Sequence, residues 1–303
     1  MKTACSRAVG VIALWAALFC TPAAQAARVG VLSNNYAAAT AADFAAKISG
    51  HTFTGVDVST SVPALASLTG AFDVLLLFED GVFANAPLVG NVVAAFAATG
   101  RPVVLGTFYD QDRSDVSNPA LSSPPHGWGT ALESIDPNTT DGIGVRTDAA
   151  GVPNLPRTLN TATIVAHPLT VGVSALSATT GFGGGNQAKS GTTVLATWTE
   201  PNARGFADPL IAFRVSGATC VIQIGIAPDY AVGVGTGYGG FTGNFYTVWK
   251  NAFDFGATNC FGAAPPNTGI AVPTLSGNGL ALTLLLIVAA AFSQRRRFVR
   301  PAR

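Results

Sequence analysis

Four apolar runs separated by helix-forming segments occupy residues 28–106, and this alternation is the feature that most constrains the fold. The runs are RVGVL (28–32), FTGVDV (53–58), DVLLLF (73–78) and RPVVLG (101–106), and the helical segments cover 37–49, 62–68 and 86–100. A continuous run such as DVLLLF is typical of a strand that is buried on both faces. The alternation therefore predicts an α/β fold with an open, mostly parallel, flavodoxin-like sheet that carries helices on both faces.

The second half of the chain predicts further strands and one closing helix. Residues 107–160 are rich in turn-forming proline. Strands are expected over 161–166, 192–198, 209–215 and 219–226. The last two form a late antiparallel hairpin with Gly217 near its turn. Residues 243–257 have apolar side chains at helical spacing and predict a final helix that packs on the sheet.

The N-terminal residues have the layout of a signal peptide. Lys2 and Arg7 precede the apolar stretch Ala8–Cys20, and the small residues Ala23-Ala24-Gln25-Ala26 follow. This pattern predicts cleavage after Ala26 and export of the remainder. A retained N-terminal anchor is the alternative.

Export changes the net charge of the part of the chain that would meet a partner. Of the 17 Lys and Arg residues, seven lie in the two terminal segments, whereas all 16 Asp and Glu residues lie between them. The exported part therefore has ten basic and 16 acidic residues, a net charge of about −6. Its bases are scattered singly, so a nucleic-acid partner is not expected.

Two cysteines remain once a signal peptide containing Cys5 and Cys20 is removed. Cys220 and Cys260 form an even pair in an oxidising compartment, which predicts a disulfide. Two separate buried thiols are the alternative. No Cys or His lies at metal-ligand spacing, so a zinc-type site is not expected.

The C-terminal residues read as a membrane address. The linker AAPPNTGIA (263–271) is followed by a short polar motif, an uncharged stretch over 279–292, and a cluster of arginines. The apolar stretch is short for a bilayer, which needs about 20 residues of helix. Because basic residues stay on the cytoplasmic side, this C-terminal transmembrane helix would hold the large domain outside.

This tail resembles the bacterial IPTL-CTERM sorting signal, a relative of the PEP-CTERM tails. Val272 stands for the usual isoleucine, and Asn278 for a common tryptophan. The resemblance implies a sorting protease of the exosortase type as a partner, transient or lasting contact with the inner membrane, and delivery to the cell envelope or surface, where polysaccharide is a further partner. A plain C-terminal anchor is the alternative. The residues that carry the resemblance are Val272, Pro273, Thr274, Leu275, Ser276, Gly279, Arg295, Arg296 and Arg297.

The exported part resembles the class I glutamine amidotransferase-like fold, especially its trehalose-utilisation type. The resemblance lies in FDVLLLFED, TGRPVVLGTFYD, AHPLTVGV and FYTVWKNAFDFGA. Catalytic members of that family carry a nucleophilic Cys on a sharp turn after a strand. Here Thr107 and Phe108 follow the corresponding strand RPVVLG. The resemblance thus implies the fold and argues against the activity.

Carboxylates follow two neighbouring strands and form the candidate ligand or cation site. Open α/β sheets bind ligands beyond the carboxyl ends of their strands. The spacing of DQDRSD also allows a Ca²⁺ ion, the one cofactor considered, although the EF-hand pattern is absent. Solvated turn carboxylates are the alternative. The residues concerned are Glu79, Asp80, Asp110, Asp112 and Asp115.

Two further features are given non-catalytic interpretations. His51 at a helix exit and His126 in a proline-rich loop are read as solvated, and His167 as structural. The stretch GVGTGYGGFTGN (233–244) lacks the P-loop lysine, which favours an aromatic-lined loop over a phosphate site.

Taken together, the sequence predicts four parts: a signal peptide (1–26), an exported α/β domain (27–262), a linker (263–271) and a sorting signal (272–303). The expected function is that of a non-catalytic envelope protein that contacts surface polysaccharide. An extracellular hydrolase that uses the strand-end carboxylates is the alternative.

Overall fold

The computed structural model describes residues 26–80, 83–107, 128–138, 156–178, 186–202, 205–229, 231–232 and 240–260. The chain divides into two compact units, Met1–Ala264 and Pro265–Arg303. Every described residue belongs to the first unit. The predicted signal peptide up to residue 25, the whole linker (263–271) and all of the sorting motif from Val272 to Arg297 lie outside the described residues.

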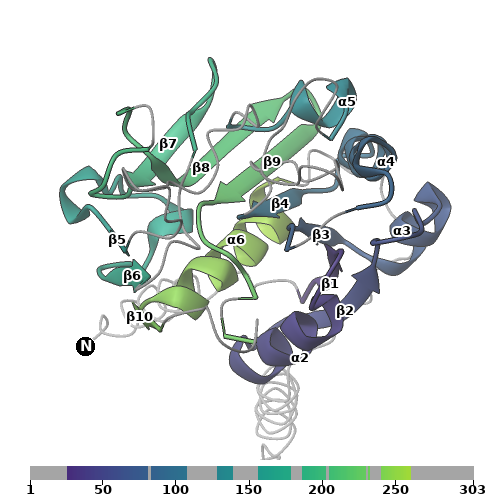
Figure 1. Ribbon diagram of the computed structural model, residues 1–303, viewed down its shortest axis with the longest axis horizontal. Helices are drawn as coiled ribbons and strands as arrows, with labels where there is room; N and C mark the ends of the chain where they lie inside the picture. Colours follow the sequence, from purple (N-terminus) through teal and green to yellow (C-terminus); the bar gives the residue numbers. More distant parts are fainter. Residues whose placement is uncertain are drawn as a thin grey trace, which may run out of the picture. The chain divides into compact units, whose positions relative to one another are not determined.

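A seven-stranded sheet with the order β2-β1-β3-β4-β9-β8-β7 forms the centre of the first unit (Figure 1). The pairs from β2 across to β9 are parallel, and β8 and β7 are added antiparallel. The mostly parallel sheet and the late β8–β9 hairpin agree with the sequence prediction. The strands are β1 (Arg28–Ser33), β2 (Thr52–Asp57), β3 (Val74–Leu77), β4 (Val103–Gly106), β7 (Thr193–Thr197), β8 (Pro209–Ser216) and β9 (Thr219–Ile224).

Helices cover both faces of this sheet. One face packs against α2 (Ala37–Lys47) and α6 (Phe245–Asn259), and the other against α3 (Leu65–Ala71), α4 (Ala86–Ala98) and α5 (Thr130–Glu133). Alternate residues of β3 serve the two cores: Leu76 lies in the α2–α6 core, and Leu77 lies in the α3–α4 core. The uninterrupted apolar sequence of β3 follows from this burial on both sides.

A second, antiparallel sheet has the order β10-β6-β5 and was not predicted. Its strands are β5 (Arg157–Thr158), β6 (Leu176–Ala178) and β10 (Phe241–Gly243). The strand predicted over 161–166 is wrong, because a 3₁₀ turn, η3 (Thr161–Thr163), begins there. The Asn160 side chain accepts a hydrogen bond from the backbone N–H of Ala162 at 3.2 Å, and such local bonds compete with strand pairing.

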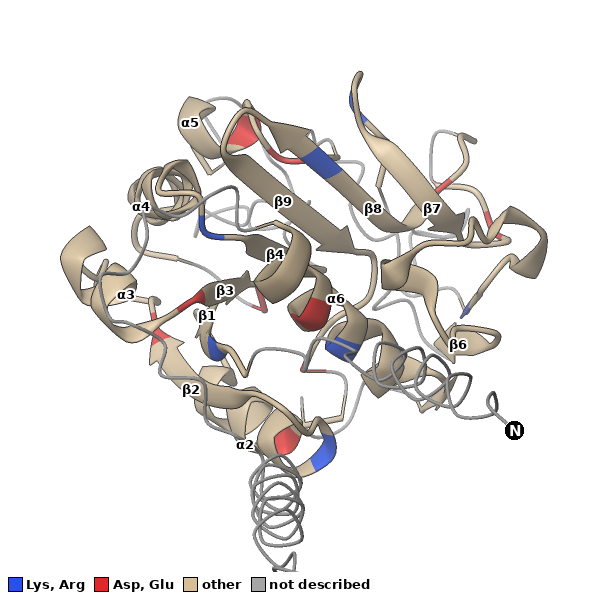
Figure 2. Ribbon diagram, turned by 180° about the vertical axis from the view of Figure 1, so that it is seen from behind, with Lys and Arg blue, Asp and Glu red and all other residues tan. Residues whose placement is uncertain are grey.

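Charged side chains are sparse on this scaffold. Figure 2 shows the Lys and Arg residues of the described chain spread singly over the ribbon. Among the described residues, no helix is both long and apolar enough to span a bilayer.

Gly90 marks the closest approach between α4 and the segment that leads into α5. A Cβ atom at this position would lie 1.6 Å from the backbone oxygen of Trp128. Because that oxygen belongs to the main chain, α4 must shift to make room. We expect Gly90→Ala to lower the free energy of unfolding by about 2 kcal/mol, measured by urea denaturation.

Gly70 in α3 is the matched control. A Cβ atom there would meet no atom within 4 Å. Gly70→Ala should therefore leave stability unchanged or raise it by up to about 1 kcal/mol, because alanine favours the helix. Equal effects of the two substitutions would contradict the close packing of α4 on Trp128.

Candidate functional site

The chain reverses its direction of winding between β1 and β3. The connection after β1 leads into α2 on one face, whereas the connection after β3 leads into α4 on the other face (Figure 1). Two loops that leave a sheet in opposite directions open a crevice between them, and ligands of open α/β sheets bind in that crevice. The sheet edge between the loops after β1 and β3, called the β1–β3 crevice below, is therefore the candidate functional site.

Two loops with polar side chains meet at this crevice. The Asn34 side-chain oxygen accepts a hydrogen bond from the Asp80 backbone N–H at 2.9 Å. The Asn35 side-chain nitrogen donates to Asp80 Oδ2 at 3.3 Å. Ser33 Oγ in turn accepts from the Asn35 backbone N–H at 3.3 Å. Amide, hydroxyl and carboxylate groups are thus held side by side at the end of the sheet.

Of the five carboxylates predicted to form a ligand site, the structure describes two. Glu79 is fully buried and Asp80 is half-buried, and both lie in the segment after β3, following Phe78. Asp110, Asp112 and Asp115 lie outside the described residues. Within the described ranges, no group of three or more His, Cys, Asp or Glu side chains is placed to hold a metal ion. A cation site here would need ligands from beyond these ranges.

Thr107 occupies the turn position after β4. Its side chain is 1% exposed, and its backbone N–H donates to the Ile226 oxygen at 3.3 Å. A threonine hydroxyl is a weak nucleophile unless a neighbouring base activates it. In the described chain no thiol is available instead, because both cysteines there, Cys220 and Cys260, are joined to each other.

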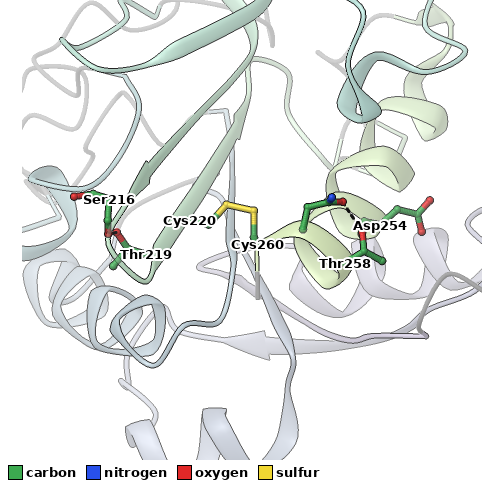
Figure 3. Close-up of a disulfide and its surroundings, with 7 residues drawn as sticks. Ser216, Thr219, Cys220, Asp254, Thr258 and Cys260 are labelled. Carbon is green, nitrogen blue, oxygen red and sulfur yellow. Dashed lines mark hydrogen bonds between the residues drawn. A yellow bond between two sulfur atoms is a disulfide. The ribbon is translucent and has the colours of Figure 1, made fainter. Parts of the chain in front are cut away.

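The disulfide ties β9 to the residue that ends α6. The two Cα atoms are 5.5 Å apart, within the usual range for a bridge. Figure 3 shows the bond between the strand and the helix end. Both half-cystines are at most 5% exposed, so the bond lies inside the core.

A buried polar network farther along the same sheet edge was not predicted. Arg157 Nη2 lies 3.2 Å from Asp208 Oδ2, and both side chains are at most 1% exposed. Asp208 Oδ1 accepts from the Asn186 backbone N–H at 3.0 Å. The Asn186 side-chain oxygen accepts from Gln223 Nε2 at 2.8 Å. These groups bond to one another, so the network joins β5, the start of β8, and β9.

The interpretation of His51 as solvated is wrong. Its side chain is only 1% exposed, and Nε2 lies 3.0 Å from Asp254 Oδ1 on α6. Burial lowers the pKa of His51, and the Asp254 carboxylate partly opposes that shift. Asp254 is distant in sequence, so no local pattern could have indicated the contact.

His167 has the structural role that was predicted. Its Nδ1 accepts from the Leu169 backbone N–H at 3.2 Å and caps the turn η4 (Pro168–Thr170). The ring also stacks on Phe213 with centroids 5.1 Å apart. Burial lowers the pKa of His167. His126 lies outside the described residues.

Comparisons with known proteins find structural neighbours of low similarity and no family for this chain. No family model matches the chain, and no curated protein matches it in sequence. Eight chains of solved structures match. One is a cold-adapted β-galactosidase from Rahnella sp. R3, with a TM-score of 0.40 and 15% identity over 66% of this chain and 29% of that one. Another is the carbohydrate deacetylase Agd3, with a TM-score of 0.32 and 14% identity over 68% of this chain and 32% of that one. The chain thus spans about a third of the length of each.

Proposed function

We propose that this chain is an exported cell-envelope protein whose α/β domain binds a ligand without turning it over. The observation that carries the proposal is the buried disulfide between Cys220 and Cys260. Structural disulfides form and persist in oxidising compartments and are rare in the cytosol. The signal-peptide pattern that ends at Ala26 supplies the route out of the cell.

The C-terminal tail supplies the localisation signal in this proposal. The apolar stretch 279–292 and the arginines behind it fit a stop that keeps the basic end in the cytoplasm. In this proposal the tail resembles IPTL-CTERM signals because it has the same role. It holds the amidotransferase-like domain outside the inner membrane until a sorting protease of the exosortase type acts on it.

The β1–β3 crevice is the proposed ligand site, and polysaccharide is the proposed ligand. Asn34, Asn35 and Asp80 present paired amide and carboxylate groups, which match the donors and acceptors of sugar hydroxyls. Thr107 stands where a nucleophile would follow β4, which favours binding over catalysis. The alternative, a hydrolase, draws support from Glu79, because a fully buried carboxylate in a ligand crevice is a candidate acid or base.

Cell fractionation followed by intact-mass spectrometry tests the proposed localisation and processing. Full-length protein expressed in a bacterium with an exosortase-type system should be recovered from the envelope fraction. Its N-terminus should be Ala27, with the C-terminus shortened where the sorting protease is active. Recovery of the chain from the cytosol with Met1 and Arg303 in place would refute the proposal.

A glycan array probed with the detergent-solubilised envelope protein tests the ligand. We expect binding without release of shortened glycans. The double variant Asn34→Ala, Asn35→Ala should weaken binding by about tenfold, because two hydrogen-bonding amides are lost. Asn259→Ala, an exposed amide at the end of α6, is the matched control and should bind normally. Glycan cleavage that disappears in Glu79→Gln would instead identify the hydrolase.

A further inference from the structure

The folded domain begins at Ala27, and Ala26 precedes it. Ala26 is exposed, whereas Ala27 is 3% exposed. The Ala27 oxygen accepts a hydrogen bond from the Thr52 backbone N–H at 3.0 Å, which places Ala27 at the start of the β1–β2 ladder. A peptidase could therefore reach the bond before Ala27, but the residue after that bond belongs to the folded domain.

The backbone nitrogen of Ala27 is the first member of a chain of polar contacts that ends on α6. It lies 3.2 Å from His51 Nδ1. His51 Nε2 lies 3.0 Å from Asp254 Oδ1, and Asp254 Oδ2 accepts from Lys250 Nζ at 2.5 Å. Because a carboxylate only accepts, Nε2 carries the ring proton, which leaves Nδ1 free to accept from Ala27. The aromatic rings of Phe53 and Phe253 pack edge-on against His51.

We propose that the bond between Ala26 and Ala27 is the processing site and that the α-amino group released there is bound by His51, whose ring is held in place by Asp254. Hydrolysis of this bond by one water leaves a carboxylate on Ala26 and an α-ammonium on Ala27. The ammonium then donates to His51 Nδ1 in a charge-assisted hydrogen bond, which is stronger than the bond from a neutral amide. The inference rests on the proposed export and adds a binding site for the new terminus.

Processing therefore changes the charge beside a buried imidazole. In the described part of the chain, the charged groups that act on the His51 ring are Asp254 and Lys250, both from α6. The α-ammonium of Ala27 adds a second cation. Burial already lowers the pKa of His51 below its ordinary value of 6.5, and a neighbouring cation lowers it further. The folded protein thus binds fewer protons here than the unfolded chain, so its stability decreases as the pH falls below 6.5.

Two chains that differ only at the N-terminus test whether His51 binds the α-amino group of Ala27. Both are released from a cleavable N-terminal fusion, one beginning at Ala27 and the other at Ala26, and both continue to Arg303. Between pH 7.5 and pH 5.5 we expect the melting temperature of the Ala27 chain to fall by about 2 to 4 °C more than that of the Ala26 chain. His51→Gln should remove the difference, because glutamine offers the same neutral acceptor and donor without titrating. Equal pH profiles of the two starting chains would overturn the proposal.

Acylation of the α-amine gives a readout that does not depend on any variant. An amine-reactive ester at pH 7.5, followed by peptide mass spectrometry, should label the terminus of the folded Ala27 chain about tenfold more slowly than that of the Ala26 chain. In urea the two should react alike. Equal labelling of the folded chains would contradict the bound terminus. Since neither experiment requires export, a failure here is distinct from a cytosolic location of the natural protein.

Discussion

Replacing Asp208 by alanine is expected to lower the free energy of unfolding by about 3 to 5 kcal/mol. Asp208 and Arg157 are both at most 1% exposed and lie 3.2 Å apart. Removal of the carboxylate takes an opposite charge away from a buried guanidinium, whose contacts also include the Glu200 and Pro201 backbone oxygens. Urea denaturation followed by tryptophan fluorescence measures the loss.

The exposed ion pair between Arg28 and Asp73 is the control for this substitution. Its side chains are 50% and 28% exposed, so water and salt screen the pair. Asp73→Ala should therefore cost no more than about 1 kcal/mol. A second variant, Asp208→Ala with Arg157→Met, should recover part of the loss, because the buried guanidinium is replaced by an uncharged side chain of similar length. An Asp208→Ala effect as small as that of Asp73→Ala would contradict a desolvated pair.

The strands of the sheet were predictable because the local sequence of each strand shows which of its side chains are buried. The stretch VLLLF (74–78) has no polar residue to place on a solvent face, and such a stretch is typical of a strand covered on both sides. The position of Glu79 and Asp80 at the sheet edge follows from the same pattern, since residues after a buried parallel strand come to its carboxyl end. The strand predicted over 161–166 failed because one side chain, Asn160, caps a turn instead.

The polar contacts were not predictable, because their partners are far apart in the chain. His51 and Asp254 are separated by 203 residues, and Arg157 on β5 of the second sheet meets Asp208, which precedes β8 of the first. The spacing of apolar residues indicates which side chains are buried, but it does not indicate which polar side chains contact each other. A lone histidine or arginine in a polar loop is usually solvated, and that general expectation gave the wrong environment for His51.

Removal of the disulfide is expected to lower the free energy of unfolding by about 3 to 4 kcal/mol. The bridge spans 40 residues, and closing a loop of that length restricts the unfolded chain considerably. The double variant Cys220→Ala, Cys260→Ala tests this without leaving a free thiol. Alanine at both positions also removes two buried sulfur atoms, so part of the loss is packing.

Reduction of the wild-type protein separates the two contributions. With dithiothreitol present, the urea midpoint of the wild type should move towards that of the double variant, whereas the variant should not respond. The remaining gap measures the packing of the two sulfur atoms. A wild type that is equally stable with and without reductant would show that the bridge contributes nothing, and the argument for an oxidising compartment would lose its physical basis. A loss of the expected size would mean that the chain reaches its full stability only where thiols are oxidised, which is outside the cytosol.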